Sequence, residues 1–241
     1  MKRGQIALFV IVAILLIAAI GLVVYTQRAA LGLEYISPEI QPIKAEIDKC
    51  FLTTAENGVY LLGMQGGYIN PPQASLKTNL STIAYAYFKG KSIFPSVEKM
   101  QAELSNYIDT MIPQCANFSQ FSDFSITSGT AETSTIIKEN EILLNLNWPM
   151  TLEKGSSYRM KTFSAKVPVR LGLIQKIGSN IASSTIKDPS HMDLSYLISL
   201  NEDYNMTADI IPYENDVIYS ITDPKSIVLG KPYNFLVANG F

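Results

Sequence analysis

The hydrophobic positions are unevenly distributed, and the longest apolar run lies near the N-terminus. Residues 6–25 read IALFVIVAILLIAAIGLVVY, without a charged residue. About 20 residues at roughly 1.5 Å each match the ~30 Å hydrocarbon core of a bilayer. Because the run has no polar face, it predicts a transmembrane helix in contact with membrane lipid. A fully buried helix of a soluble protein is the alternative.

The charges around this run predict its orientation. Lys2 and Arg3 precede the run, and only Arg28 follows it closely. This bias predicts a cytoplasmic N-terminus and an external C-terminal part, in a single-pass protein of the cell membrane. Tyr25-Thr26-Gln27-Arg28, at the end of the run, offers no small-x-small site, so we expect no cleaved secretory signal peptide. The predicted parts are a cytoplasmic foot with the transmembrane helix (1–27), a juxtamembrane helix extension or linker (28–36) and an extracytoplasmic domain (37–241).

Helical spacing of apolar residues recurs in the external part. Ser37-Pro38-Glu39 predicts a helix start, and one apolar face continues to Leu62 before three glycines end the helix. A second helix is predicted to begin near residue 95 and to end at Pro113. Further helices are predicted over 171–186 and, from a capping box at 190–193, up to residue 200.

Strand-like segments alternate with these helices. Residues 82–88 (TIAYAYF) predict a short strand, and the Ser- and Thr-rich residues 122–135 predict a loop or a weak edge strand. Residues 141–152 and 157–169 predict a hairpin. Pro149 and Pro168 lack an N–H, so we expect them at edges or strand ends.

The C-terminal segment completes the predicted fold class. Its last strands are predicted over 216–222 and 233–237, joined by a turn at 223–226. The order of elements predicts an α+β protein: an N-terminal transmembrane helix, then an extracytoplasmic domain with two N-terminal helices, a β-hairpin, further helices and C-terminal strands.

Charge excludes one class of partner. The 241 residues carry 19 Lys and Arg against 21 Asp and Glu, a net charge of −2. Only four of the basic residues are arginines, and they are spread along the chain. Nucleic-acid binding requires a clustered basic face, so we expect no nucleic acid partner.

The two cysteines and three sequons fit an external location. Cys50 and Cys115 both follow the apolar run, and an oxidising compartment favours a disulfide between them. Two separate buried thiols are the alternative. Asn79, Asn117 and Asn205 each begin an N-x-Ser/Thr triplet and are candidate glycosylation sites.

Motifs for catalysis, metal binding or cofactor binding give no candidate. His191 is the only histidine, and neither a G-x-S-x-G elbow nor a C-x-x-C pair occurs. Asn201-x-Asp203-x-Asn205 begins like a calcium loop, but Met206 and Pro212 occupy the positions of the EF-hand glycine and glutamate. We therefore predict no catalytic, cofactor-binding or metal-binding residue.

Two resemblances to known families add expectations. Lys2-Arg3-Gly4-Gln5, followed at once by the apolar run, resembles the class III signal of archaeal type IV pilin-like proteins. That resemblance implies cleavage between Gly4 and Gln5 and assembly into a filament. The glutamate of that family's fifth mature position falls at Phe9.

The rest of the chain is similar to a family of uncharacterised archaeal single-span, membrane-anchored envelope proteins. The similar stretches are Gln65-Gly66-Gly67-Tyr68-Ile69, residues 163–170 (FSAKVPVR) and Tyr233-Asn234-Phe235. This resemblance implies a location in the cell envelope and no particular activity.

Three functions are compatible with these patterns. The leading prediction is a non-enzymatic, membrane-anchored extracytoplasmic protein with a structural or interaction role, bound to an envelope protein or to copies of itself. The first alternative is a pilin-like filament subunit. The second is a surface solute-binding protein or hydrolase.

Overall fold

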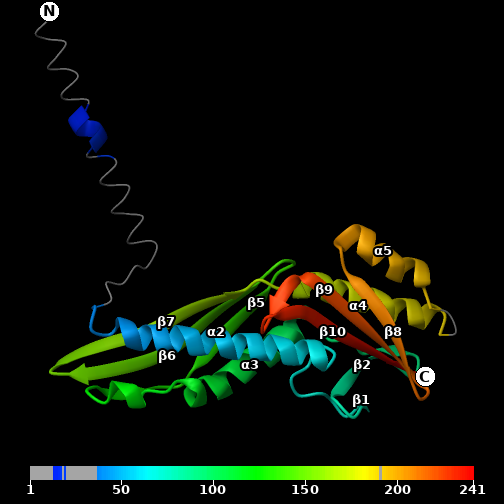
Figure 1. Cartoon of the computed structure of the whole chain (residues 1–241), viewed down its shortest axis with the longest axis horizontal. Helices are drawn as coiled ribbons and strands as arrows, with labels where there is room; N and C mark the ends of the chain where they lie inside the picture. Colours follow the sequence, from blue (N-terminus) through cyan, green and yellow to red (C-terminus); the bar gives the residue numbers. More distant parts are fainter. Residues whose placement is uncertain (1–12, 18, 20–36, 190–191) are drawn as a thin grey trace, which may run out of the picture. The chain divides into compact units, whose positions relative to one another are not determined.

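The computed structural model describes residues 13–17, 19, 37–189 and 192–241. The chain divides into two compact units, Met1–Gln41 and Pro42–Phe241. Each unit is described by itself, and the second contains nearly all of the described secondary structure (Figure 1).

The structure corrects the prediction of a transmembrane helix at 6–25. Among the described residues, no helix has the length and apolar character needed to cross a membrane. Residues 13–17 and 19 are helical. The remainder of 6–25 lies outside the described residues, as do Gly4 and Gln5.

The second unit has mixed α+β content with two sheets. Its helices are α2 (Gln41–Met64), α3 (Val97–Cys115), α4 (Leu171–Lys187) and α5 (Leu194–Tyr204), with a short 3-10 turn at Ser119–Phe121. Its strands are β1 (Ser75–Lys77), β2 (Thr82–Phe88), β3 (Lys91–Ser92), β4 (Ser125–Ser128), β5 (Glu132–Ile137), β6 (Ile142–Lys154), β7 (Ser156–Val167), β8 (Thr207–Tyr213), β9 (Asp216–Val228) and β10 (Lys231–Gly240).

The smaller sheet is built on the predicted hairpin. Strands β6 and β7 pair antiparallel across Gly155, and β4 and β5 both pair with the other side of β6. Alternate residues of β6 are buried, from Ile142 to Leu152, as their period of two predicts. The segment predicted as a loop or weak edge strand forms β4 and most of β5.

Pro149 departs from the prediction, because it lies inside β6, the central strand. At Pro149, the strand pairing of β6 is interrupted on both sides. On one side β4 ends opposite Met150 and β5 begins opposite Asn147. On the other side the pairing with β7 shifts register between the same two residues. The missing N–H therefore falls where neither ladder continues.

The larger sheet has the order β1-β2-β10-β9-β8, with β3 also paired to β2. Only the β2–β10 pairing is parallel. The predicted turn at 223–226 is wrong, because these residues lie within β9. Asp223 pairs with Tyr233 and Ile227 pairs with Pro232, so the three residues between them bulge out of the ladder. The turn falls instead at Leu229 and Gly230, both of which have positive φ.

Helix α2 links the two sheets along its length (Figure 1). Near its start, Lys44 lies over the ring of Phe163 in β7. Near its end, the Val59 carbonyl accepts a hydrogen bond of 3.0 Å from the hydroxyl of Tyr233 in β10. A Cβ at Gly63 would lie 2.3 Å from the Asn234 carbonyl oxygen, so the close approach of helix and strand requires glycine.

Helices α3 to α5 differ from the predictions mainly at their ends. Pro113 lies within α3, which continues to Cys115, because a proline in the last turn removes only one helical hydrogen bond. Asp193 is the N-cap of α5 and accepts a hydrogen bond from Tyr196 N. Ser190, its predicted capping partner, lies outside the described residues. The predicted inward face of α4 is buried at Ile174, Ile177, Gly178 and Ile181.

Candidate functional site

An apolar groove of about 550 Å³ lies on the larger sheet. Its floor is formed by one residue from each of three adjacent strands: Ile83 of β2, Leu236 of β10 and Ile218 of β9. Ile211 and Tyr213 of β8 form one wall, and the loop of residues 78–81 forms the other, with Met64 at the end of α2. The volume lies within the range of about 300–1,000 Å³ that is typical of ligand sites.

The groove follows from the alternation of side chains in the strands. Phe235 contacts Phe94 edge-to-face, and Asn239 Nδ2 donates a hydrogen bond of 2.8 Å to Thr185 Oγ1 in α4. These odd-numbered residues of β10 thus face the helix side, and Leu236 faces away from it. Leu236, with Ile218 and Ile83, belongs to an apolar cluster on that opposite face.

The wall formed by residues 78–81 presents an exposed leucine. Thr78 Oγ1 accepts hydrogen bonds from Leu80 N (3.2 Å) and Ser81 N (3.0 Å). Thr78 N also donates to Ser81 O at 2.9 Å. These bonds fix a tight loop in which 94% of Leu80 is exposed. The loop therefore holds a large apolar side chain almost entirely in contact with water, directly beside the apolar groove.

The lining of the groove carries no charged side chain. Tyr85 belongs to the apolar cluster that forms the floor, and it donates a hydrogen bond of 2.6 Å to Asp216 Oδ2. Burial, together with this bond, raises the pKa of Tyr85, which therefore stays protonated at neutral pH. The groove is suited to apolar groups and offers no counter-charge to an ionic ligand.

A second hollow, on the smaller sheet, is polar and more open. It has a volume of about 400 Å³ and is lined mainly by Glu132, Ser134, Asn145, Asn147 and Thr162. Asn147 Oδ1 is buried without a hydrogen-bond partner there. No aromatic side chain lines this hollow, so it lacks the stacking surface of a typical sugar site.

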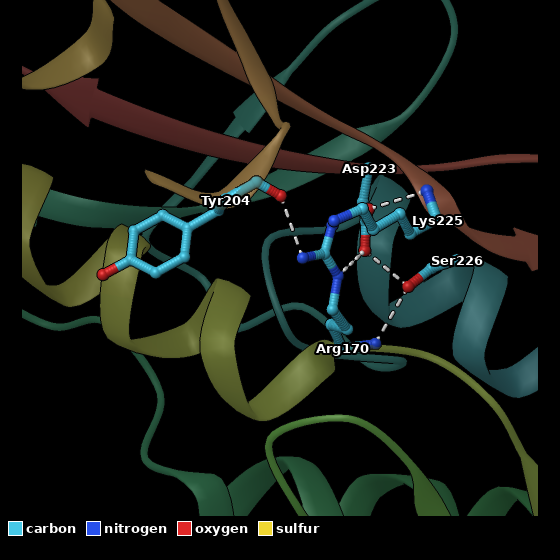
Figure 2. A network of polar contacts seen from close by, with 5 residues as sticks. All are labelled: Arg170, Tyr204, Asp223, Lys225 and Ser226. Carbon is cyan, nitrogen blue, oxygen red and sulfur yellow. Dashed lines mark hydrogen bonds and ion pairs between the residues drawn. The ribbon is translucent and has the colours of Figure 1, made fainter. Parts of the chain in front are cut away.

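A buried ion pair joins α4, α5 and β9 (Figure 2). Arg170 Nε donates to Asp223 Oδ2 at 2.9 Å, and its Nη2 donates to Oδ1 of the same carboxylate. Its Nη1 donates to the Tyr204 carbonyl at the end of α5, at 2.9 Å. Ser226 accepts a hydrogen bond from Arg170 N and donates one to Asp223. Every oxygen of the fully buried carboxylate has partners, so the cluster clamps three elements together.

The electrostatics of this clamp favour the charged pair. Burial acts to raise the pKa of Asp223, but the hydrogen bonds from Arg170, Ser226 and Lys225 N–H outweigh it. The pKa therefore lies below its usual value. This group is held in one charge state, as expected of a structural carboxylate.

Glu103 fixes the glycine turn that follows α2. Its Oε2 accepts hydrogen bonds from Ile69 N (3.1 Å) and Asn70 N (3.0 Å), and Lys99 Nζ lies 2.9 Å from Oε1. Gly66 and Gly67 have φ of +71° and +87°, a left-handed conformation that favours glycine after the end of a helix. The Gln65–Ile69 stretch is thus a supported turn.

The structure places the two cysteines as predicted. A disulfide joins Cys50 of α2 to Cys115 at the end of α3, with 5.8 Å between the Cα atoms. The bond connects the two helices at a sequence separation of 65. Cys50 is buried, whereas Cys115 is exposed.

The three candidate glycosylation sites lie apart, and each is exposed. Asn79 stands on the rim of the groove, next to Leu80. Asn117 Oδ1 accepts hydrogen bonds from Ser119 N and Oγ. Asn205 caps the end of α5 with φ of 54°. Asn201 and Asp203 lie within α5, so the stretch predicted to resemble half a calcium loop forms a helix end. Glycosylation at the three sites stays a prediction.

No group of three or more His, Cys, Asp or Glu side chains within the described part of the chain is arranged to hold a metal ion. His191 falls outside that part. Sequence reasoning missed the groove and the clamp. The single local signal for the groove is Leu80, an apolar residue in the polar loop Lys77-Thr78-Asn79-Leu80-Ser81.

Comparison with known proteins identifies no relative of this chain. No protein-family model, no curated protein and no solved structure matches the chain. The resemblances of residues 2–5 and of the three later stretches stay predictions.

Proposed function

We propose that residues 42–241 form a non-catalytic interaction domain, working outside the cytoplasm, that binds an apolar partner in the groove. The observation that carries this proposal is the groove itself. Its floor is an apolar cluster on a sheet face, and no charged side chain lines it.

Exposed apolar surface in and beside the groove is energetically unfavourable in water. Contacts with water at Ile211, which is 44% exposed, and at Leu80 are unfavourable by about 25 cal/mol per Å² of apolar area. A rigid loop and a strand hold these side chains in place, so the groove cannot collapse to bury them. A partner with apolar groups removes this surface from water.

The disulfide and the sequons support an external location. Disulfides persist in oxidising compartments and are rare where thiols are kept reduced. Of the sequon asparagines, Asn117 and Asn205 are exposed and lie outside the groove, as a glycan would require.

An apolar fluorescent dye of the anilinonaphthalene type tests the groove with the full chain. We expect the folded protein to bind the dye, and Ile211→Asp to weaken binding about tenfold or more, because the dye would then cover a charged carboxylate. The matched control is Ile198→Asp, which alters an exposed isoleucine of α5 (69% exposed) outside the groove. Equal dye affinity of wild type and Ile211→Asp would contradict the proposal.

A surface solute-binding protein is the second candidate, and the same groove favours it. The two functions differ in what occupies the groove in the cell. Native mass spectrometry of the full chain purified from its own cells separates them: a co-purifying apolar small molecule, lost in Ile211→Asp, favours solute binding. A ligand-free protein favours the interaction domain.

A further inference from the structure

We propose that the partner in the groove is a second copy of this chain, and that each copy inserts Leu80 into the groove of the other. This inference rests on the proposed function, because it names the partner of the same site. It assigns the groove and the loop of residues 78–81 to a two-fold interface.

The inserting group is Leu80. It is 94% exposed, the highest value among the exposed large apolar side chains of the described chain. The hydrogen bonds to Thr78 hold its loop in a defined conformation. A preorganised loop loses little conformational entropy when it enters a partner.

The receiving surface has matching chemistry. Ile211, Leu236 and Ile218 are aliphatic, and they lie in the same groove that the loop borders. No charged side chain of the lining would lose its hydration when leucine enters. The groove accommodates a leucine side chain in volume and in polarity.

The placement of the two features explains why a second copy fits. Leu80 borders the groove, so one surface carries both an exposed apolar side chain and an apolar recess that can receive one. A two-fold axis then brings each leucine onto the other groove, and one rotation makes both insertions and closes the assembly.

Charges beside the groove are complementary under the same operation. Lys77 precedes the inserting loop, and Glu214 follows Tyr213 on the opposite wall; both are exposed. The two-fold operation directs the loop side of one copy toward the β8 side of the other. Opposite charges there favour the pairing.

Sedimentation equilibrium of the full chain over a range of protein concentrations tests the inference. We expect the wild type to be a dimer at protein concentrations of about 10 µM and above, as is typical of a modest interface. Leu80→Asp places two carboxylates in the interface, so at about tenfold each it should weaken dimerisation about hundredfold. Leu80→Met keeps an apolar side chain and should retain the dimer.

The control is again Ile198→Asp, which removes an exposed isoleucine on α5 and should leave the dimer intact. All variants share the apolar run at 6–25, so association through it would be common to all of them. Fluorescence of Trp148, the single tryptophan, checks that each variant is folded.

Three results would overturn the inference: a monomeric wild type, a dimer unaffected by Leu80→Asp, or a dimer lost equally in Ile198→Asp. The dye-binding experiment shows whether only the dimer proposal is wrong or whether the proposed function is wrong as well. If the protein is monomeric and Ile211→Asp still abolishes dye binding, the groove binds another partner and only the dimer is wrong. If the dye is also insensitive to Ile211→Asp, both proposals fail.

Discussion

Asp223 shows at the scale of one residue how a polar group is accommodated in the interior. A carboxylate without solvent exposure is costly unless it is paired and hydrogen-bonded. Here Arg170 binds it with two nitrogens, and Ser226 and Lys225 N–H supply further donors. Because each charge is stabilised by the other, removing one member leaves an unpaired buried charge and lowers the stability of the fold.

Replacing Asp223 with asparagine should therefore lower the free energy of unfolding by about 3–5 kcal/mol, the range for breaking a buried ion pair. The reason is that Arg170 would be left partly buried without its counter-charge. Urea denaturation measures the loss. The control is Asp123→Asn, which breaks an exposed pair with Lys154 and should change stability by less than about 1 kcal/mol. Equal losses in the two variants would contradict the structural role of the clamp.

The same residue predicts a dependence on pH. The pKa of Asp223 in the folded state lies below its unfolded value. Its contribution to stability is then present above the unfolded pKa of about 3.9 and is lost as the pH falls through the folded pKa. The difference in unfolding free energy between wild type and Asp223→Asn should shrink in that acid range. A difference that stays constant into strong acid would show that ionisation of Asp223 is not involved.

At the scale of elements, α2 and α3 depend on one covalent link. Cys50 and Cys115 join them at a sequence separation of 65. In the chain-entropy model, closing a loop of this length restricts mainly the unfolded chain.

Cys50→Ala with Cys115→Ala should lower the unfolding free energy by about 2–4 kcal/mol. Chemical denaturation with and without a reductant measures this. The wild type should be destabilised by the reductant, whereas the double variant should be insensitive to it. A wild type whose stability is unchanged by complete reduction would contradict the prediction.

Some helices and strands of the fold can be predicted from the local spacing of apolar residues, and others cannot. The buried faces of α2, α3 and β6 follow from the spacing of their apolar residues. Strand β8 was missed because its residues are mostly exposed and include Pro212, so that neither burial nor alternation marks it. The sequence Asp223-Pro224-Lys225-Ser226 has the residues of a turn and forms a bulge, because Arg170 holds Asp223 inside.

At the scale of the folded unit 42–241, the two sheets share α2 as a common support. Its first half lies against β7 and its second half against β10. Helix α3 contacts α2, since Leu104 and Tyr107 pack against Gly58. It also contacts β5 through the Ser105–Thr135 hydrogen bond. We therefore expect the sheets to unfold together.

Trp148 allows this cooperativity to be measured. It is buried in the smaller sheet, with Nε1 donating to the Gly129 carbonyl at 3.0 Å. Its fluorescence should follow that sheet, while far-UV circular dichroism follows all helices and strands. The two denaturation curves should coincide, as in a two-state transition. Separate midpoints would show that the smaller sheet unfolds independently.

The sequence by itself determined which residues avoid water within α2, α3 and β6, and it identified the cysteines that the structure places together. These properties depend on periodicity and residue type, which are local. The transmembrane helix expected at 6–25 was inferred from hydropathy, and no described helix combines the length and the apolar character that it needs.

Only the tertiary structure decided the groove and the clamp. The groove takes its lining from α2, the 78–81 loop and four strands, and the clamp joins residues 53 positions apart. Such sites depend on strand order and register. Neither is encoded in local spacing, because both result from packing among segments distant in the chain.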